Sequence, residues 1–301
     1  MRLALVLGFV VVVAAFVSPH AVATRIADAP CPETGPGGIR VCPSGVVGRS
    51  YRIELEGSGG CGPALPYAFT LMNGSLPPGL SLQADGILRG TPAIAGTWSF
   101  WLQLSDQDPP SAPWCVPKKS EREFSLHVEP PPGSVGAPYA VAFGAPGDRP
   151  QTWSIAAGEL PPGLVLDAVT GTLGGTPQLQ GSFPFRLAAV DSRGQTASLD
   201  FAITVAPKLA IATARLLATR VGVPYRARVR TSGGVRPLRL GVVAGRFPTG
   251  VRLNAVTGLL SGRPRKAGSF RITIEARDAV GATAVRTLVL TVRARSPRHG
   301  K

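Results

Sequence analysis

Short runs in which apolar and polar residues alternate, separated by turns rich in glycine and proline, recur along the chain. In residues 158–185, Pro162 fixes φ at the second position of a turn and Gly163 can adopt the positive φ of the third. An alternating segment, 164–166, follows with strand spacing, and Thr170 with Gly171 predicts a second turn. The pattern therefore predicts short β-strands joined by tight turns, in which these glycines and prolines hold backbone geometry rather than carry chemistry.

The same order of turns and strands occurs three times. The first copy covers 74–100 and the third covers 245–272, so that the copies begin 84 and 87 residues apart. This spacing corresponds to one small domain each and is too long for a solenoid repeat. We expect three tandem domains followed by a short basic tail: repeat 1 at 44–129, repeat 2 at 133–206, repeat 3 at 207–294 and the tail at 295–301.

Within repeat 1 the alternation predicts one strand for each of the positions B to G of a sandwich. The expected ranges are 51–56, 67–72, 80–82, 87–88, 97–105 and 121–128. With a short A strand before Val47, this is an all-β, seven-stranded Greek-key sandwich of the immunoglobulin type. In that topology the B–C and F–G loops emerge at the same end of the domain.

The first 23 residues have the pattern of a secretory signal peptide. Arg2 precedes an apolar run at 3–17, and Ala21 and Ala23 form an Ala-x-Ala cleavage site. The run is short for a membrane span, and no later run is long enough, so that a transmembrane anchor is not expected. The mature protein is expected to be secreted or displayed at the cell surface.

The cysteines favour an oxidising environment outside the cell. All four lie after the signal segment, and an even number in an exported chain predicts two disulfides. Compared with repeat 2, repeat 1 carries one insertion with Cys61 in its B–C loop and another with Cys115 in its F–G loop. Because these loops are neighbours, we expect a Cys61–Cys115 bridge, which leaves Cys31 and Cys42 to pair within the N-terminal segment, 24–43.

Further motifs stand at matching places in the three copies. They are Val-Gly-x-x-Tyr, Leu-Pro-Pro-Gly-Leu, Gly-Thr-Pro and an aspartate ten residues after a glycine (Asp106, Asp191 and Asp278). Together they resemble the bacterial putative immunoglobulin-domain family, which is similar to the dystroglycan-type cadherin-like domains. The resemblance covers nearly all of 44–294 and implies a cadherin-like sandwich used in extracellular proteins for adhesion or as a spacer. Thr249 and Arg263 depart from the motifs, but only in turns.

The resemblance also implies a calcium hypothesis, since cadherin-like junctions bind this ion through carboxylates. The candidate ligands are Asp106 and Asp108 in one group, and Glu129, Asp148 and Asp191 at the first junction. Calcium takes about six to eight oxygen ligands, more than any one end of a domain offers as carboxylates. We favour the alternative that each late aspartate caps its own F–G turn through backbone N–H groups, so that no cofactor is expected.

An aromatic candidate lies in repeat 1. Alternation along strand F places Phe100 and Leu102 inward and Trp101 outward. Together with Trp114 of the F–G insertion, Trp101 could form a stacking surface for a sugar or a peptide. We favour the alternative that the insertion folds over the sheet and covers Trp101.

The net charge of +15 is concentrated at the C-terminal end. From residue 207 onward, 20 Lys and Arg stand against two acids. Alternation places arginines on both outer faces of repeat 3: Arg226, Arg228 and Arg230 on strand B, and Arg271 and Arg277 on strand F. Such a surface attracts polyanions or an anionic membrane surface without sequence specificity. The alternative is a compositional bias of a solvated surface. No motif indicates sequence-specific binding of nucleic acid.

No set of residues suggests catalysis. The three histidines lie in the signal segment, in a predicted strand and in the tail, and no nucleophile, base and orienting group can be assembled around them. We expect a non-catalytic secreted or cell-surface protein that binds an extracellular protein or carbohydrate, or acts as a spacer. The alternative is an accessory module that holds a partner hydrolase to a polymer, such as a carbohydrate or an anionic wall polymer.

Overall fold

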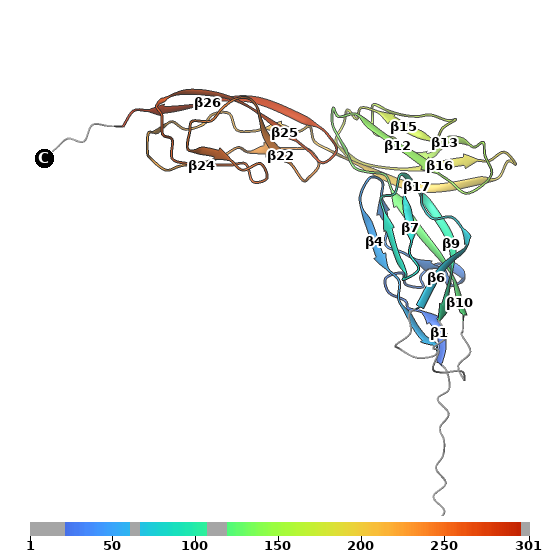
Figure 1. The fold of residues 1–301 in the computed structure, drawn as a ribbon. Helices are drawn as coiled ribbons and strands as arrows, with labels where there is room; N and C mark the ends of the chain where they lie inside the picture. Colours follow the sequence, from blue (N-terminus) through green and yellow to red (C-terminus); the bar gives the residue numbers. More distant parts are fainter. Residues whose placement is uncertain (1–21, 61–66, 107–118, 296–301) are drawn as a thin grey trace, which may run out of the picture.

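A computed structural model of the chain describes residues 22–60, 67–106 and 119–295. These residues form three β-sandwiches in succession (Figure 1). The expected all-β class and the three tandem immunoglobulin-like domains are confirmed. The signal segment, 1–23, lies almost entirely outside the described residues.

Repeat 1 has the strands that the alternation predicts, within a few residues at each end. They are β3 (Gly45–Val46), β4 (Tyr51–Glu54), β6 (Tyr67–Gly74), β7 (Leu80–Leu82), β8 (Ile87–Gly90), β9 (Ile94–Asp106) and β10 (Lys119–Glu129). One sheet consists of β3, β10, β9 and β6, and the other has the order β4-β8-β7. Strand B of the prediction is therefore β4, and strand F is β9.

Repeat 2 repeats this arrangement. Its strands are β11 (Gly133–Ser134), β12 (Tyr139–Gly144), β13 (Thr152–Gly158), β14 (Leu164–Leu166), β15 (Thr172–Gly175), β16 (Gly181–Val190) and β17 (Thr196–Ala206). They pair in the orders β11-β17-β16-β13 and β12-β15-β14.

Repeat 3 has the same two sheets and a fuller A segment. Its strands are β18 (Ala210–Ile211), β19 (Thr219–Arg220), β20 (Tyr225–Arg228), β21 (Thr231–Ser232), β22 (Arg239–Gly245), β23 (Val251–Leu253), β24 (Leu259–Gly262), β25 (Gly268–Arg277) and β26 (Thr283–Arg293). The sheet orders are β19-β26-β25-β22 and β20-β24-β23, and β18 pairs with β21.

Each repeat buries the inward side chains of its F and G strands. Phe100, Leu102 and Leu104 of β9 are buried, as the alternation predicts, and the ring of Phe100 stacks on that of Phe124 with centroids 5.8 Å apart. The equivalent inward residues of the other two repeats are Phe185, Leu187 and Ala189 of β16, and Ile272, Ile274 and Ala276 of β25. The three cores thus follow the period-two pattern of the sequence.

The repeated turn requires glycine because, as the sequence suggests, its backbone has a positive φ at this position. Gly79, Gly163 and Gly250 have φ of +92°, +92° and +94°. A Cβ on Gly163 would also lie 2.1 Å from the carbonyl oxygen of Thr176 on the neighbouring turn. Any other residue would be strained at this point and would also clash.

The N-terminal segment packs against repeat 1 in a way that the sequence does not reveal. Strand β1 (Val22–Ile26) pairs antiparallel with β5 (Gly57–Gly60), which is part of the B–C insertion. A 3₁₀ turn, η1 (Pro36–Gly38), and β2 (Arg40–Val41) follow, and β2 extends the sheet along β10. Ile26 is buried in the core of repeat 1. This segment therefore belongs to the first sandwich.

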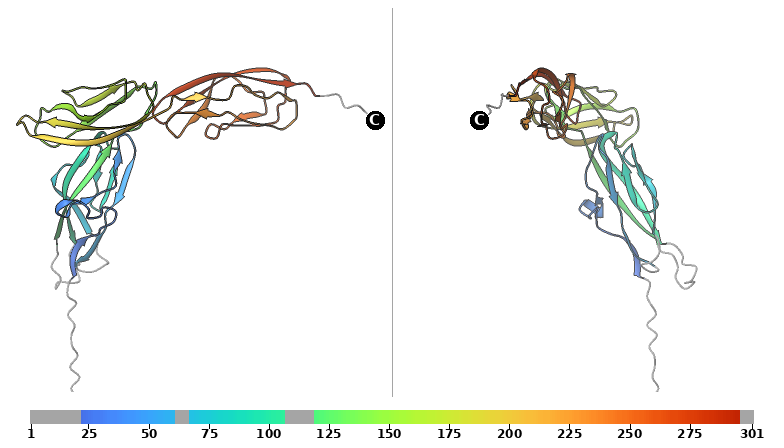
Figure 2. Two further views of the ribbon diagram at one scale, coloured as in Figure 1. Left: turned by 180° about the vertical axis from the view of Figure 1, so that it is seen from behind. Right: turned by 60° about the vertical axis from the view of Figure 1, so that its left-hand side comes forward.

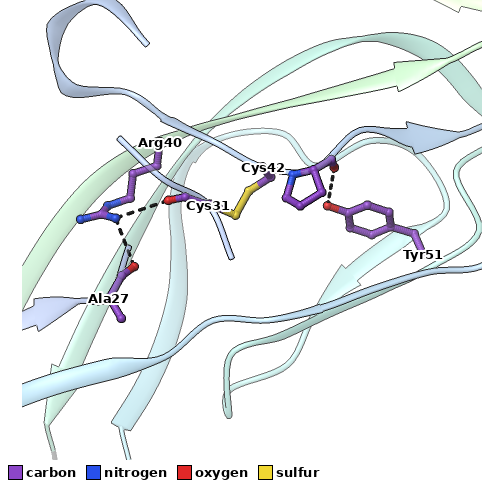
Figure 3. Close-up of a disulfide and its surroundings, with 6 residues drawn as sticks. Ala27, Cys31, Arg40, Cys42 and Tyr51 are labelled. Atoms are coloured by element: carbon purple, nitrogen blue, oxygen red, sulfur yellow. Dashed lines mark hydrogen bonds between the residues drawn. A yellow bond between two sulfur atoms is a disulfide. The ribbon is translucent and has the colours of Figure 1, made fainter. Parts of the chain in front are cut away.

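A disulfide joins Cys31 and Cys42 in this segment, as expected (Figure 3). Next to it, the guanidinium of Arg40 is buried, and its Nη1 donates to the carbonyl oxygens of Ala27 at 3.1 Å and Cys31 at 3.4 Å. The same nitrogen forms an ion pair with Asp28 at 2.6 Å. The disulfide and this arginine together hold the N-terminal segment in one conformation, whereas the strand pairs β1–β5 and β2–β10 attach it to repeat 1. Cys61 and Cys115 lie outside the described residues, so their bridge stays a prediction.

Repeats 1 and 2 share a β-sheet at their junction. Strand β12 of repeat 2 pairs in parallel with the start of β9, so that Gly144 lies opposite Gly96. The ring of His127 in β10 stacks on Phe201 of repeat 2 with centroids 5.3 Å apart. Figures 1 and 2 show repeat 1 meeting repeat 2 at a steep angle. The orientation of the two sandwiches is thus fixed by backbone pairing as well as by side chains.

Repeats 2 and 3 are joined by side-chain packing. They follow one another end to end in Figure 1 and in the left-hand view of Figure 2, and Ala137 of repeat 2 is buried within the core cluster of repeat 3. A tyrosine on strand B anchors the chain before each of the first two repeats: the Tyr51 hydroxyl donates to the Pro43 carbonyl at 2.9 Å (Figure 3) and Tyr139 donates to that of Pro131 at 2.8 Å. The buried hydroxyl of the equivalent Tyr225 has no partner among the described residues.

Candidate functional site

The late aspartates of repeats 2 and 3 cap their F–G turns. Oδ1 of Asp191 accepts hydrogen bonds from the backbone N–H groups of Arg193 at 2.9 Å and Gln195 at 2.8 Å. Oδ1 of Asp278 accepts from Val280 at 3.0 Å and Ala282 at 2.7 Å. The backbone bond from Gln195 is the main reason that the pKa of Asp191 is lowered. These two carboxylates accept the backbone hydrogen bonds of their own F–G turns, which is the capping role that we favour for them.

The B–C and F–G loops meet at one end of each of these sandwiches, as the topology predicts. In repeat 2 the backbone N–H of Asp148 donates to Oδ2 of Asp191 at 3.2 Å. In repeat 3 the N–H of Val235 donates to Oδ2 of Asp278 at 2.9 Å. The same topology in repeat 1 is the basis for expecting Cys61 and Cys115 to be neighbours.

The proposed calcium ligands are dispersed among several local contacts. Asp148 and Asp191 lie together, but Nε of Arg193 forms an ion pair with Asp148 at 2.6 Å and brings a positive charge to the pair. Glu129 lies 3.3 Å from Nε2 of His127 instead of joining them. In 22–60, 67–106 and 119–295, no three His, Cys, Asp or Glu side chains gather as a metal site would require. Asp106 is buried, and Asp108 lies outside the described residues.

Trp101 points away from the core of repeat 1, as predicted, and is 41 % exposed. On the outer face of its sheet it stands between Asn73 of β6 and Glu123 of β10. Trp114 and the rest of the F–G insertion lie outside the described residues, so that the two alternatives for Trp101 both stay open as predictions.

The three-stranded sheet of repeat 3 carries a row of positive charge on its outer face. The register places Arg226 of β20 opposite Ser261 of β24, and Ser261 opposite Arg252 of β23. Arg226, Arg228 and Arg252 are all exposed, whereas the alternate residues, such as Tyr225, are buried. We call Arg226 and Arg252, with Ser261 between them, the arginine row.

The other sheet of repeat 3 carries a second concentration of charge. Arg239 of β22 lies directly opposite Arg277 of β25, and both are exposed. Arg271 lies further along β25, opposite Val289. We call Arg239 and Arg277 the arginine pair. Like charges directly opposite each other on a sheet are destabilising.

Carboxylates form ion pairs with arginines in repeats 1 and 2, whereas on these faces the one nearby acid of the described residues, Glu275, shares the face of the arginine pair without forming an ion pair. In repeat 2, for example, Nε of Arg186 lies 2.7 Å from Oδ1 of Asp200 across the strands. Within the part of the chain that the structure describes, no carboxylate forms an ion pair with the arginine row or the arginine pair. The alternation predicts Arg226, Arg228, Arg230, Arg271 and Arg277 as outward residues; all five are exposed, although Arg230 lies beyond the end of β20. Arg239 and Arg252 emerge only from the strand register.

The comparisons with known proteins agree with this architecture. The fold defines a tandem array of immunoglobulin-like sandwiches, and the family model described as "Putative Ig domain" matches residues 42–129, 124–206 and 209–293. The chain belongs to this family. No curated protein sequence matches it.

Several solved structures are similar to parts or all of the chain. A putative α-galactosidase from Bacteroides fragilis is 27 % identical over 29 % of this chain, which spans only 18 % of that enzyme, with a TM-score of 0.26. Domains EC22–24 of mouse cadherin-23 are 14 % identical, with 91 % of this chain and 100 % of that chain covered and a TM-score of 0.28. Extracellular domains 3–5 of Drosophila OTK are 14 % identical, with 92 % and 98 % covered and a TM-score of 0.34.

Proposed function

We propose that this protein is a non-catalytic extracellular spacer and binding protein, in which repeats 1 and 2 hold repeat 3 at a distance and repeat 3 binds polyanions. The observation that carries this proposal is the pair of uncompensated arginine faces, above all Arg239 directly opposite Arg277. The signal-like segment at 1–23 and the Cys31–Cys42 disulfide support export of this protein from the cell. No helix of the described ranges is long and apolar enough to cross a membrane.

The physical reason for anion binding is the repulsion within each face. The repulsion is strongest in the arginine pair, where the two guanidinium groups lie on neighbouring strands; in the arginine row, β24 separates the two arginines. Such repulsion raises the free energy of the folded domain, and an anion placed between the charges relieves it. A polymer of anions gains further because it releases its condensed counterions on binding. The interaction should therefore be strong at low salt, weak at high salt and largely indifferent to the order of units in the polymer.

The shape supports a spacer role. The shared sheet at the first junction and the buried Ala137 at the second limit the rotation of each repeat against the next. The basic repeat lies at one end of the array and the N-terminal segment at the other (Figure 1). A ligand bound by repeat 3 would therefore be held away from the N-terminal segment.

The test is retention of the mature full chain on immobilised heparin, with elution between about 50 and about 500 mM salt. We expect the wild-type protein to bind at the lower salt. The variants R226Q/R252Q and R239Q/R277Q should each elute at a lower salt concentration than wild type. The control R49Q/R89Q removes the same charge from exposed positions of repeat 1 and should elute with wild type. Failure of the wild-type chain to bind at about 50 mM salt would overturn the proposal.

A further inference from the structure

Repeat 3 contains a cleft at a place where the other two repeats have an aromatic side chain. The cleft has a volume of about 670 Å³ and lies between the end of strand B, the B–C loop and the D–E turn. Leu240 and Val256 form part of its apolar wall, and three arginines line it, Arg228, Arg230 and Arg236.

Matching backbone hydrogen bonds identify the equivalent position in each repeat. The first buried residue of strand C donates its N–H to the D–E turn: Phe69 to Ala84 at 2.9 Å, Trp153 to Ala168 at 2.8 Å and Leu240 to Ala255 at 2.8 Å. In repeats 1 and 2 the ring lies so close to the turn that a Cβ on Gly86 or Gly171 would come within 2.7 or 2.6 Å of it. Leu240 is much smaller than either ring, and the space that it leaves contributes to the cleft.

A second set of matching bonds shows that the charge of the cleft is particular to repeat 3. Leu55, Phe143 and Val229 each donate their N–H to the glycine that follows the D–E turn, Gly86, Gly171 and Gly258 respectively. The residues flanking Val229 are Arg228 and Arg230. At the same positions, repeat 1 has Glu54 and Glu56, and repeat 2 has Ala142 and Gly144. The two positions thus change from acidic through neutral to basic along the chain.

The arginines of the cleft are available to a ligand. In the described ranges, no carboxylate forms an ion pair with Arg228, Arg230 or Arg236, and their side chains make no hydrogen bond there. A guanidinium group offers a planar fork of donors that matches a carboxylate or a sulfate. Three such groups around one concave site favour a ligand with concentrated negative charge.

We propose that this cleft binds an anionic sugar residue of an acidic polysaccharide through its carboxylate or sulfate group, an inference that rests on the polyanion-binding role of repeat 3 given above. The arginines hold the anionic group. The hydroxyls of Thr231 and Thr257 also line the cleft and can bond sugar hydroxyls, while Leu240 and Val256 offer an apolar surface to the C–H groups of the ring. No aromatic side chain of the described residues lines the cleft, so a nucleobase would find no aromatic ring on which to stack.

The test uses short ligands that occupy one site, so that it is independent of long-chain binding to the outer faces. The mature full chain is titrated by calorimetry with a heparin tetrasaccharide, which carries sulfate and carboxylate groups, with a galacturonate tetrasaccharide, which carries carboxylate alone, and with tripolyphosphate. The central variant is L240W, which introduces the residue of repeat 2, fills the cleft and leaves every charge in place. A second variant, R230Q/R236Q, keeps the cleft open and removes its charge. The control R246Q/R265Q removes the same charge from exposed loops of repeat 3 that do not line the cleft.

We expect at least one oligosaccharide to bind the wild-type chain, and both L240W and R230Q/R236Q to weaken this binding by about tenfold or more, with the control close to wild type. L240W should still be retained by a heparin column through the outer faces, so that loss of the cleft and loss of the general polyanion role are distinguishable. Oligosaccharide binding that L240W and R230Q/R236Q leave unchanged would overturn the proposal. So would binding of tripolyphosphate at the cleft that is tighter than that of either sugar.

Discussion

Gly96 of repeat 1 and Gly144 of repeat 2 lie opposite each other in a parallel strand pair, and a Cβ on Gly96 would come within 2.4 Å of the Gly144 carbonyl oxygen. The two sandwiches can therefore share a sheet only because neither residue has a side chain at this point. On the other side, a Cβ on Gly144 would meet Ile94 and Trp98 at 3.1 Å. The angle between repeats 1 and 2 depends on these two close approaches.

Replacing Gly96 by valine should therefore separate the two repeats without unfolding either. The added methyl groups have no space at the junction, and β12 can move away from β9 while the pairs within each sandwich remain. We expect small-angle X-ray scattering to show a broader distribution of inter-repeat distances, with an unchanged far-ultraviolet circular dichroism spectrum. A scattering profile identical to that of the wild type would show that the junction does not depend on this contact.

The tyrosine anchors predict a loss of stability at alkaline pH. Burial raises the pKa of Tyr51 from 10.0 to about 12 and also raises that of Tyr139. The folded state therefore holds these phenol protons more tightly than the unfolded state, so their contribution is complete below about pH 10 and decreases as the pH rises toward 12. Denaturant unfolding at a series of pH values should show this decrease, and Y51F should show a smaller one.

At neutral pH the hydroxyl groups of Tyr51 and Tyr225 should contribute differently to the free energy of unfolding. Y51F removes the hydrogen bond to Pro43 and should cost about 1 kcal/mol in the free energy of unfolding. Y225F is the matched control: the Tyr225 hydroxyl is buried and has no partner among the described residues, so its removal should be neutral or stabilising. Equal losses in the two variants would contradict this assignment.

The disulfide of the N-terminal segment should stabilise repeat 1 in particular. Closing the loop between Cys31 and Cys42 is worth about 3 kcal/mol in the chain-entropy account. The double variant C31S/C42S should lower the melting temperature of repeat 1 and increase proteolysis near β1, and it should leave the unfolding of repeat 3 unchanged. An equal shift in all three repeats would mean that the array unfolds as a single cooperative unit.

Much of each sandwich could be predicted from the sequence because its signals are local. Alternation in β9 gave the inward and outward residues correctly, and the turn at Gly163 has the positive φ that its motif requires. The capping role of Asp191 and Asp278 also follows from nearby backbone groups. Such features need only the residue, its neighbours in the chain and the period of a strand.

The features that depend on distant segments could not be predicted. Strand β5 is Gly57-Ser-Gly-Gly60, which has no alternation, and it forms a strand only because β1 pairs with it. Gly96 and Gly144 look like ordinary turn or strand glycines until the two repeats are placed together. The replacement of Trp153 by Leu240 is visible in an alignment of the repeats. The cleft itself could not be predicted, because it forms only where the end of strand B and the B–C loop, which carry its arginines, meet the D–E turn.

The salt dependence of heparin affinity tests the central claim most directly, because its slope reflects the number of positive charges that repeat 3 places against the polyanion. For the wild-type chain, the logarithm of the association constant should fall steeply and linearly with the logarithm of salt concentration. The variant R226Q/R252Q/R239Q/R277Q lacks the arginine row and the arginine pair and should bind more weakly with a clearly shallower slope, whereas R49Q/R89Q should match the wild type. An unchanged slope and affinity in the fourfold variant would contradict the claim that these two faces of repeat 3 bind polyanions.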